Sequence, residues 1–118
     1  MSRRDLSSLV PHLSRIEAIL WQEASYHGAK RFTELFSLAK SDDAWDLGEF
    51  ERQITMDKDL WHGMGTIGDQ YFNDRQTNRE FRMAYLRLAE ACERVGLGSP
   101  FTRQVIDVLG TLAKEGLL

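Results

Sequence analysis

Cysteine, proline and long apolar runs are scarce in this sequence, and each scarcity excludes a class of protein. The chain of 118 residues has one cysteine, Cys92, and two prolines, so no internal disulfide can stabilise it. No segment approaches the roughly 18 apolar residues of a membrane span, and no apolar run follows the two arginines near the start. We therefore expect a reduced, cytoplasmic protein without a signal peptide or membrane anchor.

An excess of positive charge is also missing. The net charge of −3 gives no general reason to expect nucleic acid or an anionic membrane as a partner. Hydrophobic residues make up 42% and charged residues 28% of the chain, which is typical of a globular protein. The length fits one domain, so we expect residues 1–118 to form a single folded unit.

Motifs for catalysis and metal binding are absent from the sequence. The three histidines, His12, His27 and His62, form no H-E-x-x-H or H-x-x-x-H pattern, and no P-loop, G-x-S-x-G or G-x-G-x-x-G motif occurs. Glu23 and His27 are four residues apart, which we interpret as an ordinary surface pair. Cys92 lies among apolar residues of a helical pattern, which favours a core position over a nucleophile. We predict a protein without enzymatic activity, metal or cofactor.

Apolar residues recur at the three-and-four spacing of helix faces. The first such face comprises Leu6, Leu9, Val10, Leu13, Ile16, Ile19, Leu20 and Ala24. Similar patterns occupy residues 29–39, 41–54, 77–95 and 100–114, and no segment alternates apolar and polar residues as a strand would. The sequence predicts an all-α fold, a compact single-domain bundle of about five helices.

Polar residues at the expected helix starts are predicted to cap the exposed backbone N–H groups. We expect the second helix to begin near Ala29, after residues 26–28 interrupt the pattern. Gly96 and Leu97 suit a left-handed helix end of the Schellman type. The predicted caps are Ser7 or Ser8, Ser41, Thr77 in a box with Glu80, and Ser99 ahead of Pro100.

Residues 41–59 carry seven carboxylates and only two basic side chains, a net charge of −5. Arg75, Arg79 and Arg82 form a short basic stripe at helical spacing further along the chain. One interpretation is that the two surfaces are solvated or pair with each other. The other is that the acidic edge faces a basic partner, because charge of one sign speeds association and sets register.

Two tryptophans and a glycine-rich loop accompany the acidic stretch. Trp45 lies inside it and Trp61 at its end, and tryptophan is common at binding hot spots although it also fills cores. Residues 60–69, LWHGMGTIGD, lack the lysine and the preceding strand of a phosphate-binding loop. We interpret this loop first as a structural corner, with a protein-contact loop and a small-ligand site as the alternatives.

The loop also carries a resemblance. Gly63-Met64-Gly65-Thr66 followed by Asp69, after an amphipathic, an aromatic and an acidic helix, resembles a family of small bacterial all-helical domains of unknown function with a GMG(S/T)xxD loop. The resemblance implies a fold and no activity. His62 stands where that family would have another glycine.

These features favour a small acidic bacterial binding protein, an inhibitor of the immunity-protein type that covers a basic surface of a toxin or enzyme. The predicted contact residues are Asp42, Asp43, Trp45, Asp46, Glu49, Trp61, His62, Met64, Thr66 and Asp69. One alternative is a homo-oligomeric scaffold, as a homodimer for instance, that pairs through Tyr85, Phe101, Leu117 and Leu118. The other is a ligand-binding domain in which His62 acts as acid or base beside Thr66 and Asp69.

Overall fold

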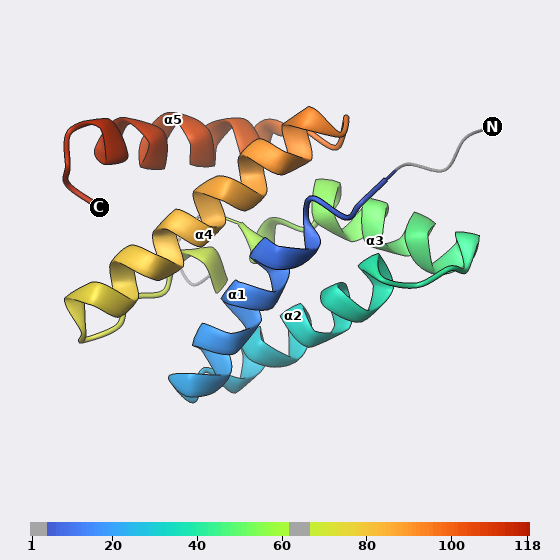
Figure 1. Cartoon of the computed structure of the whole chain (residues 1–118), viewed down its shortest axis with the longest axis horizontal. Coiled ribbons are helices and arrows are strands. Elements are labelled where there is room, and N and C mark those ends of the chain that lie inside the picture. Colours follow the sequence, from blue (N-terminus) through green and yellow to red (C-terminus); the bar gives the residue numbers. More distant parts are fainter. Residues whose placement is uncertain (1–4, 62–66) are drawn as a thin grey trace.

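A computed structural model of the chain describes residues 5–61 and 67–118 (Figure 1). Its elements are helices, with no strand among the described residues. They are α1 (Val10–Gln22), α2 (Tyr26–Ala39), α3 (Ala44–Met56), the short 3-10 helices η1 (Lys58–Leu60) and η2 (Ile67–Asp69), α4 (Arg75–Arg94) and α5 (Pro100–Lys114). The prediction of an all-α bundle of about five helices is confirmed.

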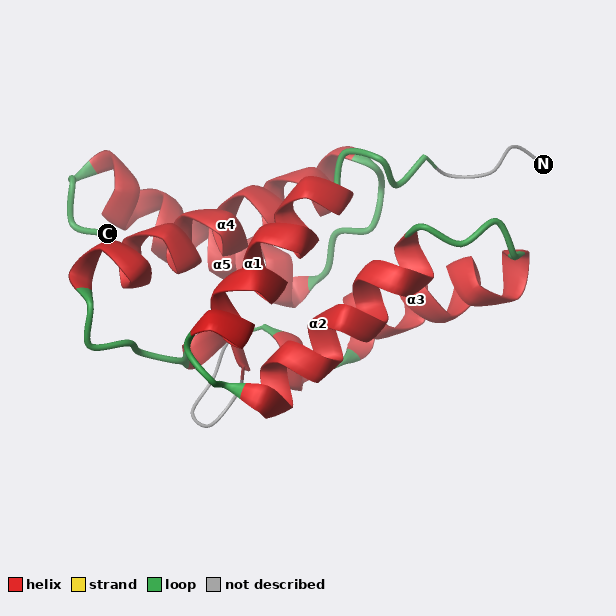
Figure 2. Ribbon diagram, turned by 60° about the horizontal axis from the view of Figure 1, so that its bottom comes forward, coloured by secondary structure: helices red, strands yellow, loops and turns green. Residues whose placement is uncertain are grey.

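The helix α1 occupies the centre of the arrangement. It packs against α2 on one side and α4 on the other, while α3 packs mainly against α2 and α5 mainly against α4. The two outer helices therefore pack on different neighbours: Figure 1 shows α5 and α3 at different edges of the molecule, and in Figure 2 α5 lies behind α4. Each outer helix leaves part of its surface open to other molecules.

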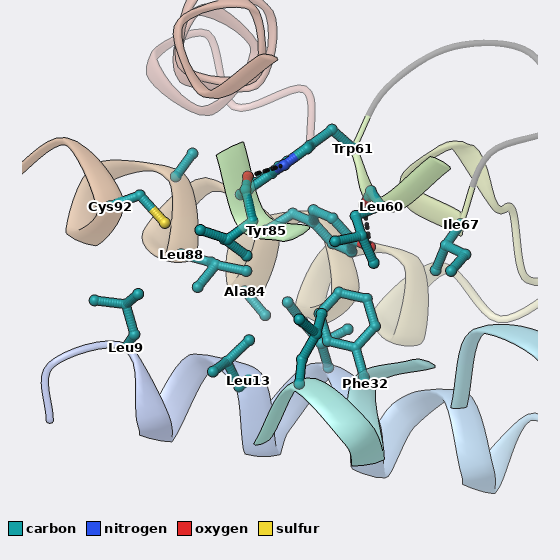
Figure 3. Packing of buried hydrophobic residues seen from close by; sticks show 14 of the residues in the cluster. Leu9, Leu13, Phe32, Leu60, Trp61, Ile67, Ala84, Tyr85, Leu88 and Cys92 are labelled. Atoms are coloured by element: carbon teal, nitrogen blue, oxygen red, sulfur yellow. Dashed lines mark hydrogen bonds between the residues drawn. The ribbon is translucent and has the colours of Figure 1, made fainter. Parts of the chain in front are cut away.

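The core collects the apolar faces that the spacing predicts. From α1 it takes Leu13, Ile16 and Leu20, each fully buried, and Figure 3 shows Leu13 facing Phe32 of α2 and the α4 side chains. The predicted stripe of α3 is also buried, and its members are Leu47, Phe50 and Ile54. Burying such a side chain stabilises the fold by about 1.5 to 3 kcal/mol.

Two helix starts differ from the prediction. Leu9, which has no capping side chain, precedes α1, so neither Ser7 nor Ser8 caps it, although Pro11 does lie in the first turn. The helix α2 begins at Tyr26 and includes Gly28 in its first turn. A Cβ atom on Gly28 would lie 2.9 Å from a methyl carbon of Ile67. The glycine is thus a site of close packing against η2 rather than a break between helices.

Aspartates cap α3 and α4 in place of the predicted hydroxyl residues. Asp43 accepts a hydrogen bond of 3.1 Å from the backbone N–H of Trp45. Asp74 accepts bonds of 2.9 and 2.7 Å from the backbone and hydroxyl of Thr77, which becomes a donor rather than a cap. Ser41 instead donates to Asp46. In both cases an acidic side chain is better suited than a hydroxyl to the positive end of the helix.

The junction between α4 and α5 follows the prediction closely. Gly96 has a φ of 80°, and the N–H of Leu97 reaches back 2.8 Å to the carbonyl of Cys92. Ser99 then caps α5, exchanging hydrogen bonds with Thr102 in a capping box, with Pro100 in the first turn. The Schellman end and the serine cap are confirmed.

Candidate protein-binding face

The outward surface of α3 presents one continuous row of exposed residues. Trp45, Gly48, Arg52 and Met56 recur at helical spacing opposite the buried stripe, so they lie on one face. The side chains at its two ends are apolar, and Trp45 is 82% exposed and Met56 71% exposed. Met56 was not among the predicted contacts, although its position eleven residues after Trp45 places it on the same face.

The predicted carboxylates lie at the beginning of this face. Asp42 and Asp43 are exposed, whereas Asp46 and Glu49 are partly buried. Asp43 caps the helix and Asp46 accepts a hydrogen bond of 2.8 Å from Ser41. The start of α3 therefore carries a cluster of carboxylates close to Trp45 in the chain.

Further along α3 the negative charge is partly neutralised within the fold. Glu49 accepts hydrogen bonds from Arg52 and Gln53, which lower its pKa from 4.5 to about 2. Arg31 of α2 donates to Gln53 at 2.8 Å and pairs with Asp57. Glu49 thus pairs with Arg52, and Asp57 pairs with Arg31. Neither pair uses the basic stripe of α4. The net acidic character of the face is concentrated around Trp45.

Trp61 belongs to the core and not to this face. It is 1% exposed, and its indole N–H donates a hydrogen bond of 2.8 Å to the carbonyl of Ile54. Its ring packs edge-on against Tyr85, with 6.0 Å between ring centroids (Figure 3). The assignment of Trp61 to the partner-binding face is corrected, because its side chain is buried in the core and is not part of the exposed row on α3.

The remaining predicted contacts belong to the glycine-rich loop. His62, Met64 and Thr66 lie outside the described residues, as does the side chain of Asp69, whose backbone ends η2. The loop interpretations, including the acid or base role of His62, therefore stay predictions. The described anchors on either side of it, Trp61 and Ile67, are both buried.

The basic stripe of α4 is divided between solvent and a neighbouring ring. Arg75 and Arg79 are exposed, and Arg82 is partly buried with its guanidinium carbon 6.0 Å from the centroid of Tyr71. Arg87, further along, pairs with Glu90 at 2.7 Å within the same helix. The stripe is thus a solvated surface with one arginine turned toward an aromatic side chain.

Within residues 5–61 and 67–118, no group of three or more potential metal-ligating side chains comes together. No helix of this part of the chain has the length and apolar character to cross a membrane. Comparisons of the chain with protein-family models, with curated proteins and with solved structures gave no match.

Proposed function

We propose that this protein is a non-enzymatic inhibitor of the immunity-protein type, a small bacterial cytoplasmic protein that covers a basic surface of a toxin or enzyme with its helix α3. The observation that carries the proposal is Trp45, a tryptophan 82% exposed beside a cluster of carboxylates on an outer helix. So large an apolar side chain contributes no burial energy while it stays in water. A partner that covers it would gain that energy on binding.

The two kinds of residue on this face have separate roles in the proposal. Trp45 and Met56 would be the anchors that lose water in the complex, since tryptophan is enriched at hot spots and methionine adapts its shape to a partner. Asp42, Asp43 and Asp46 would attract the basic surface and fix its orientation. Because exposed charges act over a Debye length of about 8 Å at physiological salt, association should slow as salt is added.

The test uses the tagged full chain to capture proteins from lysate of the source organism, followed by inhibition assays on what is recovered. Trp45→Ala and Asp42→Lys/Asp46→Lys are the test variants. The matched controls at other sites are Tyr71→Ala, at a ring 73% exposed, and Asp107→Lys/Glu115→Lys, within α5 and just after it. We expect the test variants to bind a basic partner at least about tenfold more weakly and the controls to bind it normally. Unchanged binding by both test variants would refute the α3 surface.

Self-association through α5 is the second candidate function. Val108, in the middle of this outer helix, is 39% exposed, and Leu117, beyond its end, is 61% exposed. Of the other residues predicted for this role, Phe101 is partly buried against the core and Tyr85 is only 2% exposed, so Tyr85 is withdrawn from the candidate surface. Sedimentation of the full chain at high concentration distinguishes the two functions, because a monomer at all concentrations would contradict the scaffold.

A further inference from the structure

A hollow of about 170 Å³ lies between α5, α4 and the segment around η2. Its α5 side consists of four aliphatic side chains, Val105, Val108, Leu109 and Leu112, and the residues opposite them include Trp61 and Tyr85. Only two residues of α5, Thr102 and Val105, are buried. The helix therefore leaves much of its apolar face short of partners at this hollow.

Among the described residues, two polar side chains also line the hollow. Gln70 is held in place because its side-chain oxygen accepts a hydrogen bond from the hydroxyl of Ser25. Arg82 contributes a guanidinium group, whose carbon lies 6.0 Å from the centroid of the Tyr71 ring. An aromatic ring attracts a cation but supplies no counter-charge. The hollow thus combines apolar walls with a positive charge that suits an anion.

The volume restricts what can enter. A cavity of about 150 Å³ lined by apolar side chains is known to accept benzene, so this hollow suits a ring or short branched chain of that size. A sugar would leave its hydroxyl groups unpaired against the aliphatic wall, which is costly. A nucleotide is several times larger than the space. A carboxylate is a small anion that matches a planar guanidinium with two parallel hydrogen bonds.

We propose that this hollow is a binding site for a small organic acid, with a benzene-sized hydrophobic body against α5 and Trp61 and its carboxylate on Arg82. The site uses residues of α4, α5 and the η2 segment, and none from the exposed row of α3. A negative result for this site would therefore leave the proposed inhibitor function unaffected, and a negative result for that function would leave this site unaffected.

The first experiment titrates the full chain with benzoate and, in parallel, with benzyl alcohol, which has a similar body and no charge. Binding is followed by two-dimensional NMR, which reports both affinity and position. We expect saturable benzoate binding that shifts the indole signal of Trp61 and the amides of Val108 and Leu109, with benzyl alcohol at least about tenfold weaker. Absence of saturation, equal affinity for the two probes, or shifts confined to other parts of the chain would overturn the proposal.

Variants then separate the charge from the walls. Arg82→Gln removes the positive charge, and Arg79→Gln is its matched control, an exposed arginine on the same helix. Val108→Trp fills the hollow from a position already 39% exposed, so the helix tolerates the change. We expect Arg82→Gln to weaken benzoate binding at least about tenfold and Val108→Trp to abolish it, with Arg79→Gln unchanged. Thermal unfolding of each variant establishes that it is folded. Normal benzoate binding by folded Val108→Trp would refute the site even if Arg82→Gln does not fold.

Discussion

The phenolic oxygen of Tyr85, on α4, donates a hydrogen bond of 2.8 Å to the backbone carbonyl of Leu60, the last residue of η1. Both residues are buried, and the ring of Tyr85 also packs against Phe32, Trp61 and Phe81. Burial raises the pKa of Tyr85 well above its usual value of 10.0, so the hydroxyl stays protonated and remains a donor. The bond joins α4 to the segment that leaves α3 (Figure 3).

Replacing Tyr85 with phenylalanine should therefore destabilise the protein by about 1 to 3 kcal/mol, because the Leu60 carbonyl loses its buried partner while the ring packing is kept. Urea unfolding followed by tryptophan fluorescence measures this change. Tyr71→Phe is the control, since Tyr71 is 73% exposed and its change should stay within about 0.5 kcal/mol. Equal stability of the two variants would show that the hydroxyl bond contributes nothing.

Replacing Gly68 and replacing Gly48 with alanine should change the stability of the protein in opposite directions. A Cβ atom on Gly68 would lie 1.5 Å from the carbonyl oxygen of Trp61, which is backbone and cannot move aside. Gly68→Ala should cost about 3 kcal/mol or more. A Cβ atom on Gly48, within α3, would meet no described atom within 4 Å, so Gly48→Ala should stabilise the helix by about 0.5 to 1 kcal/mol. Thermal unfolding of both variants checks the pair, and a change of the same sign in both would contradict this packing.

The helix faces were predictable because their signal is local. A residue such as Phe50 or Ile54 repeats with the helical period, and that spacing needs no knowledge of neighbouring helices. The starts of helices were less predictable. Near α4 both Asp74 and Thr77 are suitable caps, and only the structure shows that Asp74 is used. The close packing of Gly28, in the first turn of α2, against Ile67 joins positions 39 apart in the chain, which no local pattern indicates.

The candidate face was predictable only in part. Trp45 is out of phase with Leu47, Phe50 and Ile54, so its exposure could have been deduced from the spacing alone. Trp61 lies outside the helices, where no period applies, and its burial depends on Ile54 and Tyr85. The proposed acid-binding hollow has no sequence signal, because Arg82 meets the α5 side chains only through the packing of two helices.

Cys92 should be unreactive in the folded protein. The thiol has no exposed area, and burial, with a smaller effect of Glu93, raises its pKa from 9.0 to about 12. Since the thiolate is the reactive form, Ellman's reagent should label the native protein only as fast as the core opens, and should label it immediately in denaturant. Rapid labelling of the native protein at pH 7 would contradict the burial of this residue.

Protonation of His12 should make the stability of the protein depend on pH. Burial, followed by the charges of Arg94 and Arg87, lowers the pKa of His12 below its usual 6.5, while Glu90 opposes the shift. The unfolded chain thus takes up the proton more readily than the folded protein. The free energy of unfolding should be independent of this group well above pH 6.5 and should decrease as the pH falls below that value.

The test compares the free energy of unfolding of wild type and His12→Gln between pH 7 and pH 5. The lower limit keeps the measurement above the range in which Glu49 and Asp74, whose pKa values are also lowered by their hydrogen bonds, begin to take up protons. We expect His12→Gln to reduce the dependence on pH. If the free energy of unfolding of His12→Gln changed with pH as steeply as that of wild type, the folded protein would not resist protonation of His12.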